Sequence, residues 1–321
     1  MHSAVIVVNW NSWAVLDQCL EALDKQSLPF HRILVIDNGS SEPMPESFLR
    51  WQAREDVEYK TLTANTGFAM ANNIGLGTVA DCSWVALVNP DAFLDSAWHE
   101  QMRRASEAYP AAASFSSALV KADDHAFWDG LGDVYHASGL VWRSAHGHLR
   151  ISRPKAEESI FSPCAAAGFY RHQALQEVGG FDDDYFCYVE DVDLGFRLQL
   201  MGYSSILIPT AIAYHVGSAT TGGKHSDFAV YHGHRNLAWT FVKDMPGSLF
   251  WLLLPLHVMM NFAALARFTL RGQGKVIFKA KWDAIKGLPH IIRKRKSVQS
   301  TRRCSIVDIW RMLDKRLFIG K

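Results

Sequence analysis

Cysteine is scarce in this chain and follows no recognisable pattern. The five cysteines are odd in number and widely spaced, and no C-x-x-C pair occurs among Cys19, Cys82, Cys164, Cys187 and Cys304. Disulfide frameworks and zinc knuckles need paired cysteines, so the pattern argues against both. It fits a protein of a reducing compartment.

The chain also lacks the beginning that is typical of an exported protein. No basic segment followed by a signal-type apolar run is present, because residues 1–3 lead directly into a strand-like segment. We therefore expect that the chain is not exported.

Two nucleotide-binding patterns are present only in incomplete form. Gly75 to Ala80 matches the dinucleotide pattern G-x-G-x-x-A, but it lies at the end of a predicted helix. Gly217 to Lys224 resembles a phosphate loop, but two glycines stand directly before the lysine and a histidine follows it. Neither context fits, which argues against a dinucleotide fingerprint and against nucleoside-triphosphate hydrolysis.

Charge is almost balanced over the whole chain but not along it. The net charge of +1 comes from 33 basic and 32 acidic residues. Residues 267–321 hold 16 of the basic and 3 of the acidic residues, which leaves 17 and 29 in residues 1–266. An acidic body with a basic C-terminal region predicts an anionic partner, either a membrane surface or a nucleic acid.

The composition otherwise indicates a folded protein with a large core. Hydrophobic residues make up 49% and aromatic residues 12% of the 321 residues, which argues against disorder over most of the chain. The length predicts one large domain or two small ones. We divide the chain into an α/β domain, residues 1–245, and a helical membrane-association region, residues 246–321.

Short apolar runs alternate with helical patterns in the first domain. The runs cover residues 4–8, 33–36, 57–62 and 84–88. This alternation predicts a mostly parallel sheet with right-handed crossovers. Ser12 is placed to cap the first helix. A further strand is expected at 206–209, with 213–216 as its continuation or its partner. Residues 111–162 show short strand-like runs between turns and are expected to form an inserted or antiparallel portion of the same domain.

Each of the first four predicted strands ends in short polar residues. These are Asn9 and Asn11, Asp37 and Asn38, Asn65, and then Asn89 and Asp91. In parallel sheets, ligands bind beyond the carboxyl ends of the strands. One polar end would be ordinary turn chemistry, but four in succession predict a binding site at this edge.

A cluster of carboxylates lies before and at the start of a later predicted helix. Its members are Asp184, Glu190, Asp191 and Asp193. A helix N-terminus favours ionised carboxylates, so the cluster is a candidate site for a proton or a metal ion. The alternative is an acidic first helical turn with a structural role.

Two further side chains have two readings each. His215 ends an apolar run, where a lone histidine is more often packed or hydrogen-bonded than a ligand, unless an acidic partner lies close to it. Arg235 lies on a further predicted helix and would either clamp a phosphate or be an ordinary surface arginine.

The second region begins with a nearly continuous apolar run at 249–266. A spanning helix needs ~20 apolar residues, and this run is interrupted by a proline, a histidine and an asparagine. Residues 275–292 then alternate apolar and basic side chains before the basic run 293–296. Such a segment suits an anionic bilayer surface, so we favour in-plane or re-entrant attachment over a full span. The alternative is a helical hairpin buried in an oligomer.

Several short motifs, in their order along the chain, give a family resemblance. The chain resembles the inverting glycosyltransferases of family 2 with the GT-A fold, and among them bacterial rhamnosyltransferases of cell-surface polysaccharide synthesis. The matching pieces cover about residues 3–240: VVNWN at 7–11, VIDNGS at 35–40, NTGFA at 65–69, LVNPD at 87–91, GGFD at 179–182, YVEDVDL at 188–194 and YH at 214–215. The resemblance implies a Rossmann-like α/β fold with a mostly parallel sheet flanked by helices, followed here by a C-terminal helical extension.

The resemblance implies that the polar strand ends bind a nucleoside-diphosphate sugar. Asp37 would contact the nucleotide base, and Asn9 and Asn65 would line the nucleoside pocket. The remaining donor-binding residues would be Asn11, Asn38, Gly67 and Asn89.

The resemblance also implies a divalent cation, Mg²⁺ or Mn²⁺, that neutralises the diphosphate leaving group. Asp91 stands where the family's D-x-D metal motif ends, but here the motif is Asn89-Pro90-Asp91, so an amide replaces one carboxylate. Asp91 would be the principal ligand. His215 matches a histidine that helps to hold the metal in some members and favours Mn²⁺ slightly.

Asp191 matches the family's catalytic base. It would take the proton from the acceptor hydroxyl in one inverting displacement. Glu190 and Asp193 would tune this base or bind the acceptor, and Arg235 would bind an acceptor phosphate. The Q-x-x-R-W motif of the family's processive synthases is absent from the sequence, so a single transfer is expected rather than polymerisation.

The resemblance and the composition together predict a metal-dependent inverting glycosyltransferase at the cytoplasmic face of the inner membrane, attached peripherally or by a re-entrant segment. The expected donor is dTDP-L-rhamnose, and the expected acceptor is a lipid-linked saccharide. The alternatives are a UDP-hexose or UDP-N-acetylhexosamine donor, and a catalytically silent scaffold for polysaccharide assembly. No nucleic acid is expected as a partner, because the acidic body would repel its phosphates.

Overall fold

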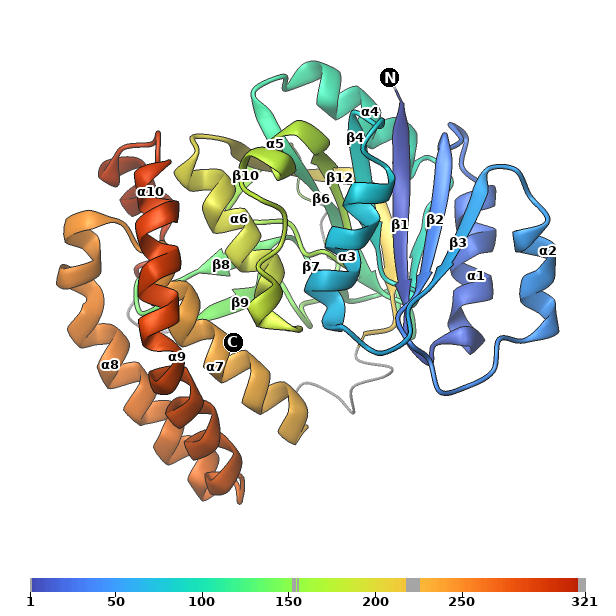
Figure 1. Cartoon of the computed structure of the whole chain (residues 1–321). Coiled ribbons are helices and arrows are strands. Elements are labelled where there is room, and N and C mark those ends of the chain that lie inside the picture. The colour runs from blue at the N-terminus through green and yellow to red at the C-terminus, as the bar shows by residue number, and fades with distance from the viewer. Residues whose placement is uncertain (1, 152–153, 155, 218–225, 317–321) are drawn as a thin grey trace.

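One ten-stranded sheet forms the centre of the protein (Figure 1). The structure is a computed structural model that describes residues 2–151, 154, 156–217 and 226–316. The strand order is β10-β12-β6-β11-β4-β1-β2-β3, with β5 paired to β12 and β7 paired to β6. The strands of this sheet are β1 Ser3–Asn9, β2 Arg32–Asp37, β3 Val57–Thr61, β4 Trp84–Val88, β5 Ala92–Leu94, β6 Ala112–Lys121, β7 Trp128–Gly130, β10 Glu158–Ile160, β11 Ala167–Arg171 and β12 Ser204–His215. A separate two-stranded sheet pairs β8 Asp133–Tyr135 with β9 Val141–Arg143.

The first four strands are parallel, as their apolar runs predict. β4, β1, β2 and β3 are neighbours in that order, and every residue of β1 and β4 is buried. Helices on both faces of a sheet require such strands to be apolar throughout. β11 is antiparallel between β4 and β6, and β6 is parallel to β12. The predicted α/β class with a mostly parallel sheet is confirmed.

Helices cover both faces of the sheet. They are α1 Trp13–Asp24, α2 Leu49–Gln52, α3 Gly67–Thr78, α4 Trp98–Ala108, α5 His172–Glu177, α6 Glu190–Leu200, α7 Asp227–Asp244, α8 Gly247–Leu270, α9 Gly274–Ser300 and α10 Ile306–Met312. Side chains of α1 and α4 form the core on one face, and side chains of α3, α5 and α6 form it on the other. A Cβ on Gly75 would lie 2.9 Å from the Ile6 side chain, so this glycine lets α3 approach β1. The G-x-G pattern thus has a packing role.

Two local expectations need correction, and one open alternative is decided. The stretch 111–162 is not an inserted or wholly antiparallel portion, because it contains β6, a buried ten-residue strand in the middle of the sheet that is parallel to β12 and that its mixed small and polar residues conceal. The runs 206–209 and 213–216 form one strand, β12, with a register shift between Ile208 and Ile212, so the second run continues the first. Ser12 stands at the N-cap of α1, but its hydroxyl donates to the Trp10 carbonyl and caps no helical N–H group.

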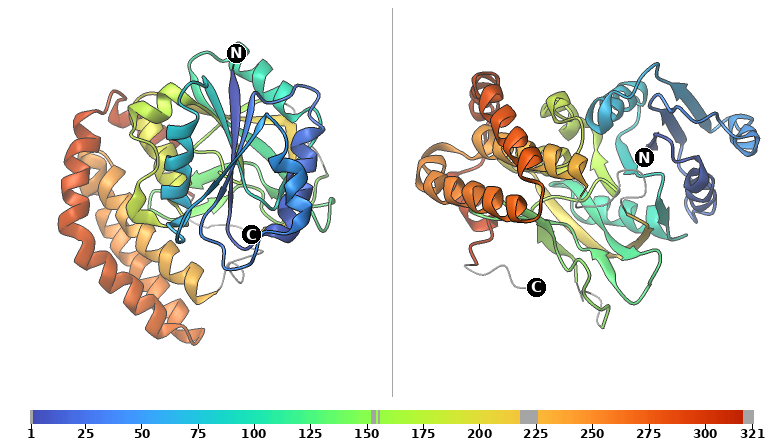
Figure 2. Two further views of the ribbon diagram at one scale, coloured as in Figure 1. Left: turned by 45° about the vertical axis from the view of Figure 1, so that its right-hand side comes forward. Right: turned by 90° about the horizontal axis from the view of Figure 1, so that it is seen from below.

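The C-terminal helices pack together at one side of the sheet, away from α1 and α2 (Figure 2). α9 lies along α7, and α8 packs against α9 and contacts α10. The expected division at residue 245 falls between α7 and α8. Among the described residues, α8 is the one helix that is long and apolar enough to cross a membrane, judged by length and composition alone. Nearly all of the incomplete phosphate loop, residues 218–224, lies outside the described residues.

Candidate active site

The carboxyl ends of β1 and β2 bring two predicted donor residues together. Asn9 and Asp37 are register partners at these ends. Asn9 Nδ2 donates to Asp37 Oδ1 at 3.4 Å, and the Ser40 N–H group donates to the same oxygen at 3.3 Å. Both side chains are buried. The edge of the sheet therefore carries polar groups that the fold holds in place.

Asn38 extends this edge to the loop after β3. Its Nδ2 donates to Asn65 Oδ1 at 3.1 Å, and its Oδ1 accepts from the Thr66 N–H group at 2.9 Å. Gly67 opens α3 with a φ of +84°, and a Cβ there would lie 2.5 Å from the Phe186 carbonyl oxygen. The glycine is thus needed for a close approach between this loop and the segment before α6.

Two further predicted donor residues, Asn11 and Asn89, have surroundings that differ from each other. Asn11 Oδ1 accepts from the backbone N–H groups of Ser41 and Glu42 at 2.9 and 3.1 Å, so this side chain holds the loop after β2. Asn89 remains at the sheet edge with a half-buried side chain, and its N–H group donates to the Ala166 carbonyl at 2.9 Å.

The two predicted metal ligands meet at the end of β4. β5 follows Asp91 directly and pairs with β12, so that His215, the last residue of β12, lies opposite Ala92. Asp91 Oδ1 is 3.4 Å from His215 Nε2, and both side chains are buried. Burial opposes ionisation of Asp91, but the nearby imidazole of His215 and the backbone N–H of Gly217 together outweigh it and lower the pKa of this carboxyl.

A second carboxylate, which the sequence did not single out, orients His215. Asp129 on β7 lies 2.8 Å from His215 Nδ1 and also pairs with Arg143 on β9. Burial lowers the pKa of His215, and its contacts with Asp129 and Asp91 reverse this and raise it. A carboxylate behind a histidine fixes the ring and favours a lone pair on the other nitrogen when a metal ion is bound.

The Asp91–His215 pair fits a divalent cation. His215 Nε2 is buried without a hydrogen-bond partner among the described residues and faces the Asp91 carboxylate. No group of three or more His, Cys, Asp or Glu side chains is arranged to bind a metal in the part of the chain that the structure describes. Mg²⁺ and similar ions are commonly held by one or two carboxylates plus substrate phosphates, so two protein ligands are sufficient.

Asp191 lies in the first turn of α6. Its Oδ2 accepts from the Ala165 N–H group at 3.2 Å, and its Oδ1 accepts from the Val192 N–H group at 2.9 Å. Because Ala166 pairs with Asn89, residues 165–166 connect Asp191 with the end of β4. Burial raises the pKa of Asp191, against these hydrogen bonds and the charge of Arg143.

Glu190 is more deeply buried than Asp191. Its Oε2 has no hydrogen-bond partner within the described residues, and the side chain is 7% exposed. Burial, and next the charge of Asp191, raise the pKa of Glu190 well above its ordinary value. Two adjacent carboxyl groups with different pKa values can divide their tasks, so that Asp191 could accept a proton while Glu190 stays neutral.

Asp193 faces the interior. It is fully buried, and it pairs with Arg197 at 2.8 Å and with Lys243 on α7 at 2.5 Å. Burial raises the pKa of Asp193, but the two cations outweigh it and lower the pKa. In this conformation Asp193 has no surface with which to bind an acceptor, and it supports α6 instead.

Arg235 on α7 contacts the segment before α6. Its Nη2 donates to the carbonyl groups of Asp184 and Tyr185 at 3.0 and 3.4 Å, and its guanidinium lies 4.3 Å from the centre of the Trp239 ring. Arg235, the predicted phosphate ligand, is therefore half-buried beside the segment before α6, and part of its donor capacity is already used.

Sequence reasoning singled out Asp91, His215 and Asp191, which the structure brings to the region around the end of β4, but it did not single out Asp129 and Arg143. Both lie on short strands within the stretch 111–162, whose pattern gives little signal. The strand pairing that brings them to His215 joins residues far apart in the chain.

Comparisons with known proteins give a family for this chain. The family model described as "Glycosyl transferase family 2" matches residues 4–179, and "Glycosyl transferase family group 2" matches residues 134–270. The chain is 26% identical over 296 residues to N-acetylglucosaminyl-diphospho-decaprenol L-rhamnosyltransferase of Mycobacterium tuberculosis, which covers 84% of this chain and 89% of that protein.

Solved structures share the fold at low sequence identity. Residues 1–349 of S. aureus TarS superpose with a TM-score of 0.58 at 16% identity, covering 96% of this chain and 89% of that one. The Pyrobaculum calidifontis mannosyltransferase PcManGT, in complex with GDP-Man and Mn²⁺, gives 0.55 at 17% identity, covering 96% and 85%. GalNAc-T7 with UDP, GalNAc and Mn²⁺ gives 0.56 at 14% identity, covering 67% and 43%.

Proposed function

The chain belongs to glycosyl transferase family 2, and we propose that it moves one L-rhamnose from dTDP-L-rhamnose to a lipid-linked saccharide, with inversion at the anomeric carbon. The relative from M. tuberculosis supports this choice, because its name specifies an L-rhamnosyl group and an N-acetylglucosaminyl-diphospho-decaprenol acceptor.

The observation that carries the proposal is the position of Asp191. The segment 165–166 joins its carboxylate to the end of β4, next to Asp91 and His215. A base held there lies beside the edge where a nucleotide sugar would bind. The acceptor oxygen forms the new bond to the anomeric carbon while the bond to the diphosphate breaks, and Asp191 receives the hydroxyl proton.

Asp91 and His215 would hold the divalent cation, Mg²⁺ or Mn²⁺. The bound cation would neutralise charge on the departing diphosphate. Asp129 keeps the ring of His215 in place for this task. Asp37, Asn38 and Asn9 line the edge at which we place the nucleotide.

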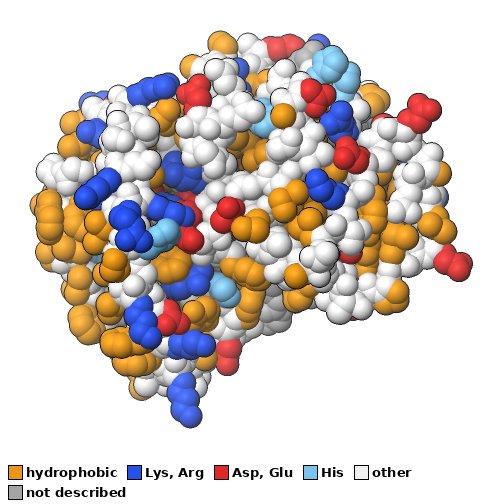
Figure 3. Space-filling view, in the orientation of Figure 1, with side chains coloured by type: hydrophobic (Ala, Val, Ile, Leu, Met, Phe, Trp, Pro, Cys, Tyr) orange, Lys and Arg blue, Asp and Glu red, His pale blue; other side chains and the backbone are white. Residues whose placement is uncertain are grey.

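The C-terminal helices support attachment to an anionic membrane, and we place the protein at its cytoplasmic face. Large apolar side chains are exposed along α8 and α9: Trp251, Leu252, Val258, Met259, Phe262, Leu270, Phe278, Trp282, Ile285 and Ile292. In Figure 3, hydrophobic side chains line the outer edge of these helices, and lysines and arginines lie among and beside them. An apolar face with basic residues around it suits the interface of an anionic bilayer, where a lipid-linked acceptor would be met.

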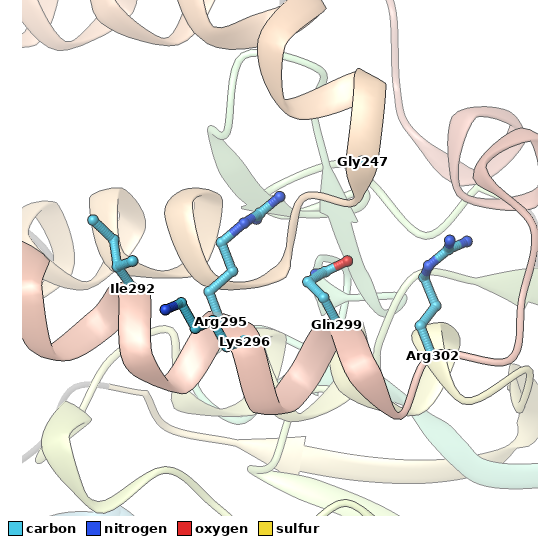
Figure 4. A pocket seen from close by; sticks show the side chains of 6 residues that line it. All are labelled: Gly247, Ile292, Arg295, Lys296, Gln299 and Arg302. Carbon is cyan, nitrogen blue, oxygen red and sulfur yellow. The ribbon is translucent and has the colours of Figure 1, made fainter.

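A basic pocket lies between α9 and the first residue of α8 (Figure 4). Its volume is about 430 Å³, and Gly247, Ile292, Arg295, Lys296, Gln299 and Arg302 line it. Three cations without an acidic lining residue favour a phosphate-bearing lipid head group. The pocket is formed by the C-terminal helices and not by the strand ends, so we assign it to membrane attachment and not to the donor.

A donor panel tests the proposed function. The full-length protein would be assayed with dTDP-L-rhamnose, UDP-N-acetylglucosamine and a UDP-hexose, each with Mg²⁺, Mn²⁺ or a chelator, and with a polyprenyl diphosphate-linked N-acetylglucosamine as acceptor. We expect turnover of dTDP-L-rhamnose that depends on the cation. Asp191→Asn should reduce kcat by about 10²–10⁴-fold and leave donor affinity nearly unchanged, because an amide cannot accept the proton.

Each other outcome has a distinct meaning. Turnover of a UDP sugar alone would replace the donor and keep the mechanism. Full turnover in the chelator would remove the role of Asp91 and His215 as metal ligands. An active Asp191→Asn variant would disprove the base assignment, and no turnover with any donor would favour the scaffold.

A further inference from the structure

The segment immediately before α6 has an unusual backbone. Phe186, Tyr188 and Val189 have φ values of 55°, 64° and 71°. Residues other than glycine seldom adopt this region, and for a β-branched residue such as Val189 it is a clear outlier. Val189 is the N-cap of α6 and directly precedes Glu190 and Asp191. Something outside the segment must hold this conformation.

Asn236 on α7 supplies that restraint. Its side chain is completely buried. Its Nδ2 donates to the carbonyl groups of Tyr185, Cys187 and Tyr188 at 3.0, 2.9 and 2.7 Å. The side-chain amide carries two N–H protons, so the three oxygens converge on both of them. The Asn236 Oδ1 accepts from Arg235 Nε at 3.0 Å, which fixes the orientation of the amide.

The same segment touches the donor side of the site. The Phe186 carbonyl accepts from the Ala69 N–H group at 3.3 Å and leaves no room for a Cβ on Gly67. The segment is therefore held by α7 on one side and by the start of α3 on the other. A small change in its path would move the first turn of α6 relative to the strand ends.

We propose that Asn236 is a positioning residue for the transfer reaction. It sets the place of Asp191 and Glu190 by holding the segment 186–189, three of whose residues have positive φ, and it does so without touching the substrate. This inference rests on the proposed function for the role of Asp191, but the restraint itself can be measured without any substrate.

The test compares two matched substitutions. Asn236→Asp keeps the shape of the side chain and removes the amide donor. Gln199→Glu is the control, because Gln199 on α6 is also buried and its Nε2 donates to the carbonyl groups of Ile160 and Phe161 at 3.3 and 3.1 Å. Asn236→Ser, which retains one hydroxyl donor, serves if the aspartate variant does not fold.

Three measurements are made on each full-length variant. Hydrogen–deuterium exchange of a peptide covering residues 185–192 should become faster in Asn236→Asp and stay at the wild-type rate in Gln199→Glu. With the donor that the wild type uses, kcat should fall about 10²-fold in Asn236→Asp, the size of loss expected when a reacting group is displaced by about 1 Å. The dissociation constant for the donor should change by less than about threefold, since a residue that positions the base alone leaves ground-state binding intact. Asn236→Ser should lie between wild type and Asn236→Asp.

Three results would overturn the proposal. These are an unchanged exchange rate in Asn236→Asp, faster exchange with an unchanged kcat, and equal losses of kcat in Asn236→Asp and Gln199→Glu, which would show a structural role only. A wild-type protein that is inactive with every donor would count against the proposed function, while the exchange rates would still decide whether Asn236 holds the segment.

Discussion

Glu190 and Asp191 are neighbours in one helical turn, and their protonation should set the pH range of activity. Burial raises the pKa of both carboxyls, and more for Glu190. A raised pKa means that the base gains its charge only at higher pH, so kcat should fall as the pH decreases through that value. We expect the acid limb of the kcat–pH profile above ~4, the ordinary value for aspartate.

The variant Glu190→Gln separates the two carboxyls. If the Glu190 side chain is protonated and neutral in the working enzyme, as its burial predicts, a glutamine at this position leaves the charge of the site unchanged. We then expect the acid limb to stay within about 0.3 pH units of the wild type. An ionised Glu190 would instead raise the pKa of Asp191, so the limb would move to lower pH in the variant. That shift in the measured profile would contradict a neutral Glu190.

At the scale of elements, α9 is joined by ion pairs to the residues that precede α6. Lys294 contacts Asp182 and lies 2.6 Å from Asp184, while Lys243 on α7 joins Asp182 to Asp193. Burial lowers the pKa of Lys294, and its hydrogen bonds to the two aspartates outweigh this and raise it. The C-terminal region is therefore joined to the 182–193 segment by ion pairs as well as by packing.

Replacing Lys294 should lower the folding stability of the protein. Lys294→Met leaves the largely buried Asp182 with fewer cations, so the free energy of unfolding should fall by about 1–3 kcal/mol. Urea unfolding at neutral pH measures this loss. The control is Lys286→Met on the same helix, since Lys286 is exposed and has no salt bridge among the described residues. Equal stability of the two variants would show that the Lys294 contacts contribute nothing.

The sequence predicted elements well where one local pattern determined them. The four parallel strands and α1, α3 and α6 follow apolar periodicity, and the polar strand ends follow from parallel topology. β6 was missed because its small and polar residues, buried between neighbouring strands, form neither an apolar run nor an alternating pattern. The roles of Asp193 and Asn236 depend on contacts from α6 and the segment before it to α7, more than 40 residues away, which no local pattern encodes.

At the scale of the whole molecule, exposed apolar and basic side chains should make membrane attachment depend on lipid charge. Full-length protein should bind vesicles that contain phosphatidylglycerol more tightly than pure phosphatidylcholine vesicles, and added salt should weaken binding because it screens the attraction. A vesicle co-sedimentation assay measures the partition coefficient. Each basic residue near the surface contributes ~1 kcal/mol.

The basic pocket allows a controlled version of this experiment. Lys296→Glu with Arg302→Glu should lower partitioning to anionic vesicles at least about 20-fold. The control reverses the same number of charges at Lys25 and Arg104, which are exposed on the α1 and α4 side of the sheet. Equal losses in both pairs would indicate attraction by net charge alone. Unchanged binding in the pocket variant, with a larger particle size in solution, would favour an oligomer that buries α8 and α9. Point substitutions serve better than deletion of residues 246–321, because deletion also removes the contacts of α9 with Asp182 and Asp184. A deletion could therefore not separate lost membrane attachment from a displaced 182–193 segment.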